Sequence, residues 1–94
     1  MSRDLAKGLT FIHKNGIAHL DIKPANLVYT DEHRLQIIDF DIAVQVKDED
    51  DLISGYLGSE GWMAPEIGKK DGPHPLYSPI RADRWSCGRV FLVF

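Results

Sequence analysis

Cysteine is almost absent from this chain of 94 residues, since Cys87 is the single one. One thiol has no internal partner, so no intrachain disulfide is expected, and the composition suits a reducing compartment. Basic residues are also in the minority, because 11 Lys and Arg stand against 14 Asp and Glu, a net charge of −3. This balance lacks the basic footprint of a nucleic-acid-binding protein.

Long apolar runs and targeting patterns are missing as well. No stretch approaches the roughly 18 apolar residues that a membrane span needs, and the first residues lack the basic segment and apolar core of a signal peptide. We therefore expect no membrane association and a cytoplasmic or nuclear location. The sequence contains no internal repeat or low-complexity segment, and it leaves the oligomeric state open.

Two helices are predicted, one toward each end of the chain. Apolar residues recur at helical spacing from Leu5 to Ile12, which predicts a helix that the turn at Gly16 ends. Ser78 followed by Pro79 is typical of an N-cap and the first turn of a second helix.

Two short strands are predicted between these helices. The apolar and aromatic runs 27–29 and 35–38 are separated by the polar turn 30–34, which favours a β-hairpin. The segment 39–66 shows little periodicity, and its four adjacent carboxylates at 48–51 indicate either a solvated loop or a partner-facing acidic patch. The expected fold class is mainly α with a short β-hairpin.

The densest cluster of chemical groups is the stretch His-Leu-Asp-Ile-Lys-Pro-Ala-Asn at 19–26. An Asp that accepts a hydroxyl proton, a Lys that steadies a transferring phosphate and an Asn that holds a metal need such crowding. The stretch closely resembles the catalytic loop of protein kinases. Asp39–Phe40 and then Ala64–Glu66 follow in the order of that family's later motifs.

The resemblance implies a partial C-terminal lobe of the protein kinase-like (α+β) fold over residues 1–94. It comprises the helix before the catalytic loop, the loop itself, the activation segment and the start of the central C-lobe helix. The Gly-rich loop and the V-A-I-K lysine of the N-lobe have no counterpart in the sequence. The apolar run 90–94 at the chain's end also indicates a fragment, so we expect the N-lobe and the remaining C-lobe to be absent.

The resemblance also implies a role for individual residues. Asp21 is expected to be the catalytic base and Lys23 the contact to the transferring phosphate. Asn26 and Asp39 are expected to hold Mg²⁺ and with it ATP, and Val28 to lie under the adenine. Because Lys at position 23 is typical of Ser/Thr kinases, the expected partner is a protein substrate with a Ser or Thr acceptor.

Each of these residues has a purely structural alternative. Asp21 and Asn26 suit the capping of their own turn, and Asp39 suits a strand end. Lys23 fits a solvated surface, and core packing alone explains Val28 equally well. The competing function is accordingly a pseudokinase-like binding module, or a truncated kinase product without activity.

Further residues match or depart from the family pattern. Ser59 takes a position usually held by Thr and keeps the hydroxyl that can bond Asp21 and Lys23. Asp83 resembles the buried helix acid that anchors the backbone of the catalytic loop. Leu20, by contrast, replaces the usual Arg, and Asp41 replaces a glycine, where a left-handed backbone would be costly for Asp.

His19 and Phe40 correspond to members of an apolar stack in kinases and are expected to have structural roles. The remaining histidines, His13, His33 and His74, share no spacing with other metal ligands, so no metal site is predicted from them.

Overall fold

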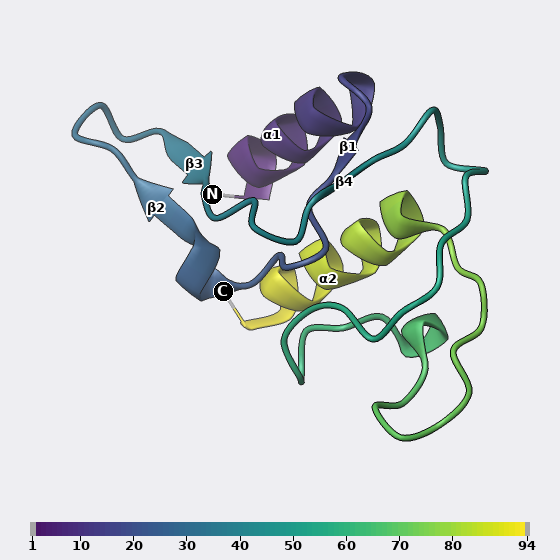
Figure 1. The fold of residues 1–94 in the computed structure, drawn as a ribbon. Helices are drawn as coiled ribbons and strands as arrows, with labels where there is room; N and C mark the ends of the chain where they lie inside the picture. The colour runs from purple at the N-terminus through teal and green to yellow at the C-terminus, as the bar shows by residue number, and fades with distance from the viewer. Residues whose placement is uncertain (1, 94) are drawn as a thin grey trace.

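The computed structural model describes residues 2–93, and two α-helices form its centre (Figure 1). Helix α1 (Ser2–Lys14) and helix α2 (Pro79–Val93) come from opposite ends of the chain and contact each other. The helices have 13 and 15 residues, whereas no strand in the described residues exceeds three. Helix therefore outweighs strand as predicted, but much of the chain between the helices is irregular.

The strands form two antiparallel pairs. The predicted hairpin is confirmed as β2 (Leu27–Tyr29) paired with β3 (Leu35–Ile37), with the second strand one residue shorter than expected. Its turn projects away from the helices in Figure 1, whereas β3 lies beside α1. The other pair, β1 (Ile17–Ala18) with β4 (Val44–Gln45), was not predicted. Two-residue strands are too short to show an alternating pattern, so only the tertiary pairing reveals them.

Helix α1 ends as its sequence predicts. Leu5 and Leu9 are buried on the face toward α2, and Ile12 packs beside them. Gly16 follows with φ 77°, a left-handed conformation that glycine adopts without the usual Cβ penalty. A Cβ there would also lie 2.9 Å from the carbonyl oxygen of Val46, so no larger residue fits without a backbone shift.

The core consists of three apolar clusters, each of which includes at least one residue of α2. Their buried members are Leu5, Leu9, Ile22, Cys87 and Val90; Leu20, Ala64, Ile67, Tyr77 and Ala82; and Ala18, Val46 and Ile80. Ile67 belongs to the 3₁₀ turn Pro65–Ile67. No helix in residues 2–93 has the length and apolar character to cross a bilayer.

Asp83 of α2 is a buried carboxylate that ties distant parts of the chain together. It is 1% exposed, and its two oxygens each accept a hydrogen bond of 2.7 Å, from the backbone N–H groups of His19 and Leu20. His13 Nε2 of α1 donates a third bond of 2.9 Å. The predicted anchoring of the 19–26 loop backbone by Asp83 is confirmed, and the contribution of His13 was not predicted.

The acidic run 48–51 packs against the first turns of α2. The Ser78 hydroxyl donates to the Glu49 carbonyl at 2.7 Å and accepts from the Arg81 N–H at 3.2 Å, which confirms Ser78 as the N-cap. Arg84 donates to the Glu49 carboxylate at 2.7 Å, with Arg81 3.9 Å away. Part of the run is therefore paired within the chain, an arrangement that neither sequence interpretation included.

Removal of the Asp83 carboxylate is expected to destabilise the fold strongly. Asp83→Ala leaves two buried backbone N–H groups without a partner, each costing about 1–3 kcal/mol, so we expect a loss of about 2–6 kcal/mol. Urea unfolding followed by circular dichroism measures it. Asp31→Ala, in the exposed hairpin turn, is the control, and an equal loss in both variants would contradict the assigned role.

The Glu49–Arg84 pair is expected to make stability depend on pH. The hydrogen bond from Arg84, and then the charges of Arg84 and Arg81, lower the pKa of Glu49 from its ordinary 4.5. A lowered carboxylate pKa stabilises the fold above pH 4.5, and that contribution disappears as pH falls through the lowered value. Glu49→Gln should therefore lower the melting temperature at pH 7 but have a vanishing effect in more acidic solution.

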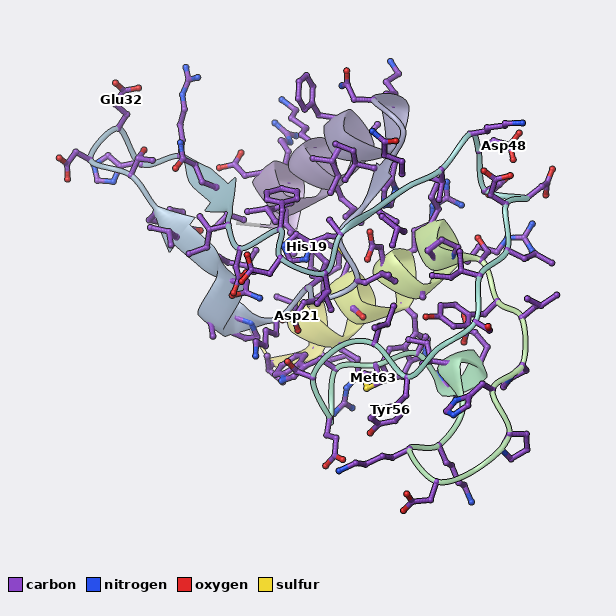
Figure 2. The ribbon with its side chains drawn as sticks, viewed as in Figure 1. His19, Asp21, Glu32, Asp48, Tyr56 and Met63 are labelled. Atoms are coloured by element: carbon purple, nitrogen blue, oxygen red, sulfur yellow. The ribbon has the colours of Figure 1, made fainter. Side chains whose placement is uncertain are left out.

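Glu32→Gln provides the matched control for this prediction. Glu32 lies at the tip of the hairpin, far from Asp48 and the rest of the acidic run in Figure 2. Its substitution should leave the melting temperature unchanged at every pH. One molar salt should also reduce the Glu49 effect, because it screens an exposed ion pair. If the difference in melting temperature between wild type and Glu49→Gln grew toward low pH, the lowered pKa of Glu49 would not be its cause.

Candidate active site

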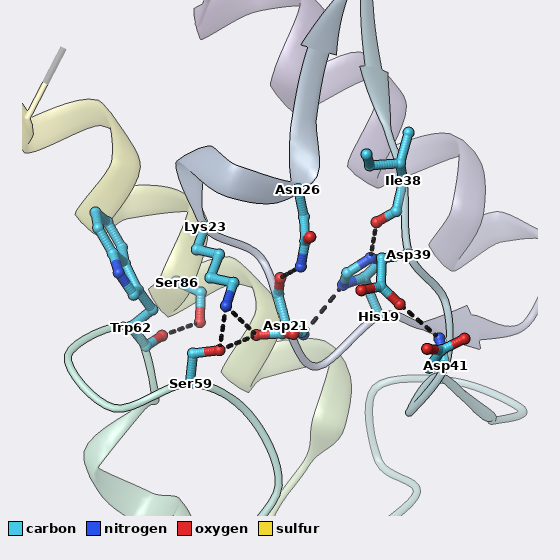
Figure 3. Close-up of polar contacts among 10 residues, drawn as sticks. All are labelled: His19, Asp21, Lys23, Asn26, Ile38, Asp39, Asp41, Ser59, Trp62 and Ser86. Carbon is cyan, nitrogen blue, oxygen red and sulfur yellow. Dashed lines mark hydrogen bonds and ion pairs between the residues drawn. The ribbon is translucent and has the colours of Figure 1, made fainter.

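Buried and accessible side chains alternate from Leu20 to Lys23. Leu20 and Ile22 are 5% and 0% exposed and anchor the loop in two of the apolar clusters. Asp21 and Lys23 lie between and after them, with side chains 18% and 28% exposed. Burial of every second residue thus turns the acid and the amine toward the same accessible side, where Figure 3 shows them together.

Asp21, Lys23 and Ser59 form a compact polar cluster. The Ser59 hydroxyl donates to Asp21 Oδ1 at 2.7 Å, and Lys23 Nζ donates to the same hydroxyl at 2.7 Å. Lys23 Nζ lies 4.0 Å from Asp21 Oδ1, at the limit of an ion pair (Figure 3). The predicted contacts of Ser59 with both residues are confirmed, although 36 or more positions separate it from them in the sequence.

The ring of His19 fixes the backbone on either side of this cluster. Nδ1 accepts the N–H of Asp21 at 3.0 Å, and Nε2 lies 2.8 Å from the carbonyl oxygen of Ile38. An acceptor Nδ1 carries no proton, so Nε2 bears the proton that it donates. The ring of Phe40 meets His19 edge-on, with centroids 4.8 Å apart, in agreement with a structural role for both.

Asn26 directly precedes β2, and Asp39 follows the end of β3 by two residues. Asn26 is the last residue of the 3₁₀ turn Pro24–Asn26, and its carbonyl accepts the N–H of Ile38 at 2.9 Å. This bond sets Asp39, the next residue, beside the start of β2. The Asn26 amide donates to the Asp21 carbonyl at 2.8 Å, so its oxygen is the atom left as a ligand.

The donor atoms of Asn26 and Asp39 fit a hard divalent cation. An amide oxygen and a carboxylate oxygen are ligands that Mg²⁺ accepts, and it commonly takes only one or two protein ligands beside water and phosphate. Asp39 is exposed, whereas Asn26 is 5% exposed and rigidly held. Within the described residues no group of three or more His, Cys, Asp and Glu side chains is arranged to hold a metal.

The backbone at Asp39 corrects the expectation for Asp41. Asp39 has φ 64° and is left-handed, while Asp41 is not among the non-glycine residues with positive φ. The Asp41 N–H instead lies 3.3 Å from Asp39 Oδ1, the contact of a local Asx turn. Asp41, at the position where the family pattern has glycine, therefore does not adopt a left-handed backbone. The residue with the strained backbone is Asp39.

Val28 of β2 is accessible. Its side chain is 41% exposed, and those of Ile38 and Phe40, which follow β3, are 39% and 42% exposed. Packing within the described residues therefore does not account for Val28. An exposed apolar side chain is available for contact with an aromatic ligand.

Sequence reasoning missed the contacts of three side chains outside the 19–26 loop. His13 bonds Asp83, and Glu49 binds the start of α2. Arg89 of α2 lies over the rings of Trp62 and Trp85. Trp85 and Arg89 are four residues apart, a spacing that predicts contact between their side chains on a helix. The contacts of His13 and Glu49 join segments 70 and 35 residues apart, for which no local pattern exists.

Comparison with known proteins agrees with this geometry. A family described as "Protein kinase domain" matches residues 1–94. CBL-interacting protein kinase 16 of Oryza sativa subsp. japonica is 38% identical over 93 residues, 97% of this chain and 20% of the relative. A calcium/calmodulin-dependent protein kinase kinase of Caenorhabditis elegans is 36% identical over 92 residues, 98% of this chain and 17% of the relative.

A third relative is named as a serine/threonine-protein kinase. Serine/threonine-protein kinase pakE of Dictyostelium discoideum is 38% identical over 85 residues, 90% of this chain and 9% of the relative. The chain thus spans a fifth or less of the length of these relatives. The match of the family over the whole chain, together with identities above a third, shows that these 94 residues belong to the protein kinase domain family.

Proposed function

We propose that residues 1–94 form the catalytic-loop part of the C-lobe in a Ser/Thr protein kinase, which transfers the terminal phosphoryl group of ATP to a protein hydroxyl. One observation carries the proposal. A carboxylate and an ammonium group are held 4.0 Å apart, and the hydroxyl of Ser59 lies 2.7 Å from each. This is the environment that an acceptor hydroxyl needs during phosphoryl transfer.

Asp21 and Lys23 have complementary roles in this proposal. Asp21 orients the acceptor hydroxyl and takes its proton as the new oxygen–phosphorus bond forms. Lys23 donates to the oxygens of the transferring group and balances the charge that develops there. His19 and Asp83 act through the backbone, because they hold the peptide units on both sides of Leu20 in place.

Asn26, Asp39 and Val28 serve nucleotide binding in the same proposal. The amide oxygen of Asn26 and the carboxylate of Asp39 would hold Mg²⁺, which neutralises phosphate charge when bound. The exposed side chain of Val28 offers an apolar contact for the adenine. The hydrogen bond from the Asn26 amide to the Asp21 carbonyl connects the nucleotide-binding residues to the proposed base. It therefore fixes the position of Asn26 relative to Asp21.

The competing function is a binding module without transfer activity. Such a module would keep the protein kinase fold without depending on the acid, the amine and the metal ligands of this site. The presence of Asp21, Lys23, Asn26 and Asp39 together favours the kinase, because a binding module has no need for all four.

Metal binding by Asn26 and Asp39 is testable in the 94-residue chain. Mn²⁺ is a paramagnetic substitute for Mg²⁺ and broadens the amide resonances of residues near its site. We expect Mn²⁺ to broaden the resonances of residues 26 and 39 first. Asp39→Asn should remove this broadening because it deletes the carboxylate ligand, whereas Asp31→Asn should not.

The acidic run supplies the outcome that would count against this assignment. It carries four adjacent carboxylates and attracts cations without any built site. Selective broadening at 48–51, with residues 26 and 39 unaffected at the same Mn²⁺ concentration, would show that the metal assignment is wrong.

The roles of Asp21 and Asp39 separate in a kinase domain completed around residues 1–94. Asp21→Ala is expected to lower the transfer rate about 10²–10⁴-fold, the usual contribution of a general base. It should leave the affinity for Mg-ATP nearly intact, because Asp21 does not bind the metal. Radiolabelled transfer to a Ser/Thr peptide and calorimetry with Mg-ATP measure the two quantities.

Asp39→Ala is the matched comparison for this experiment. It should weaken Mg-ATP binding, since it removes a metal ligand. The 94-residue chain alone sets the baseline and should give no transfer above its own Asp21→Asn variant. If Asp21→Ala abolished nucleotide binding and Asp39→Ala spared it, the two roles would be exchanged.

A further inference from the structure

The segment 58–63, which carries Ser59, has little structure of its own. Gly58 and Gly61 have φ 125° and 90°, conformations that only glycine adopts easily. A single backbone bond of 3.0 Å, from the Trp62 N–H to the Ser59 carbonyl, closes a turn within it. The position of the Ser59 hydroxyl between Asp21 and Lys23 therefore depends on contacts from outside the segment.

The apolar core and one face of α2 supply these contacts. Trp62 packs against the cluster that contains Ile22, and Met63 packs against the cluster that contains Leu20. The Ser86 hydroxyl donates to the Trp62 carbonyl at 2.5 Å, and Arg89 Nε donates to the Gly61 carbonyl at 3.2 Å. The guanidinium carbon of Arg89 lies 5.9 Å from the ring centroid of Trp62 and 5.8 Å from that of Trp85. Ser86 and Arg89 are three positions apart and Trp85 and Arg89 four, so the three side chains share one helix face.

Arg89 differs from the other arginines of α2 in how its charge is used. Arg81 and Arg84 lie within 4 Å of carboxylates of the acidic run. In the described part of the chain no carboxylate lies that close to Arg89. Its cation faces two aromatic rings instead, one from α2 and one from the 58–63 segment. A planar guanidinium can contact two rings while Nε donates to a carbonyl, which a lysine ammonium cannot reproduce.

We propose that Arg89 is a positioning residue for the 58–63 segment and, through Trp62 and Gly61, for the Ser59 hydroxyl. The part that concerns transfer rests on the proposed kinase function. Each exposed cation–π contact corresponds to about a two- to fivefold change in an equilibrium population. The Trp62 contact and the hydrogen bond to the Gly61 carbonyl together make the ordered segment on the order of tenfold more populated than without Arg89, whereas the Trp85 contact lies within α2. The effect is local, because Arg89 is exposed and outside the three apolar clusters.

Amide hydrogen exchange in the 94-residue chain tests this locality. Arg89→Met keeps an apolar side chain but removes the charge and the donor. We expect the protection of the Trp62 amide to fall on the order of tenfold, with protection in α1 unchanged. Arg84→Met, which removes an arginine from the same helix, should leave Trp62 protection unaltered. Equal losses at Trp62 and in α1 would show general destabilisation and overturn the proposal.

Fluorine NMR gives a second readout, because the chain contains only two tryptophans. With 5-fluorotryptophan incorporated, Trp85→Phe assigns the two resonances. Arg89→Met should shift the Trp62 resonance, and Arg84→Met should not. In the exchange experiment, Arg89→Lys should give intermediate protection of the Trp62 amide. Full protection in this variant would show that the guanidinium geometry is not what orders the segment. Neither measurement involves phosphoryl transfer, so its outcome is independent of the tests of Asp21 and Asp39.

Discussion

The carboxylate of Asp83 is the constraint on which the arrangement of the site depends. It accepts the N–H groups of His19 and Leu20, which precede it by 64 and 63 residues. Leu20 has φ 70°, a left-handed conformation that costs a residue with a Cβ about 1–2 kcal/mol. Two charge-assisted bonds at adjacent amides offset that cost. The shape of the 19–26 loop therefore depends on its contact with helix α2.

The same carboxylate affects titrating groups around it. Burial, and then the negative charge of Asp83, raise the pKa of the Cys87 thiol and of the Tyr77 hydroxyl. Tyr77 also donates to the Gly55 carbonyl at 3.0 Å, a bond that requires its proton. Both groups therefore stay protonated, and the segment around Gly55 keeps this attachment in neutral solution.

Local patterns were sufficient to predict the helices and the hairpin, and the family resemblance predicted the contacts of Ser59 with Asp21 and Lys23. Apolar spacing and turn residues define α1, α2 and the β2–β3 pair, and the stretch 19–26 brings its polar groups together within one turn. The β1–β4 pair, the bond from His13 to Asp83 and the binding of Glu49 to α2 could not be predicted. Each depends on a meeting of segments far apart in the sequence, which no local period encodes.

Leu20, which stands where the family pattern has Arg, belongs to an apolar cluster that holds the chain after Asp39. Its side chain packs with Ala64, Ile67, Tyr77 and Ala82, and residues of that chain, including Ile53 and Leu57, cover the cluster. Apolar burial does not require a charged group, whereas the Glu49–Arg84 pair depends on pH and is screened by salt. The segment is thus attached by apolar contacts on both sides of Glu49 and by an ion pair at Glu49 itself.

The hydrogen bond between Ser59 and Asp21 divides the carboxylate into two unlike halves. Oδ1 is occupied by the Ser59 hydroxyl, and among residues 2–93 no hydrogen bond reaches Oδ2. In the proposed function, Oδ2 is the oxygen of Asp21 that remains for an acceptor alcohol, because Ser59 occupies Oδ1. A residue 38 positions away in the sequence thus makes the two carboxylate oxygens unequal.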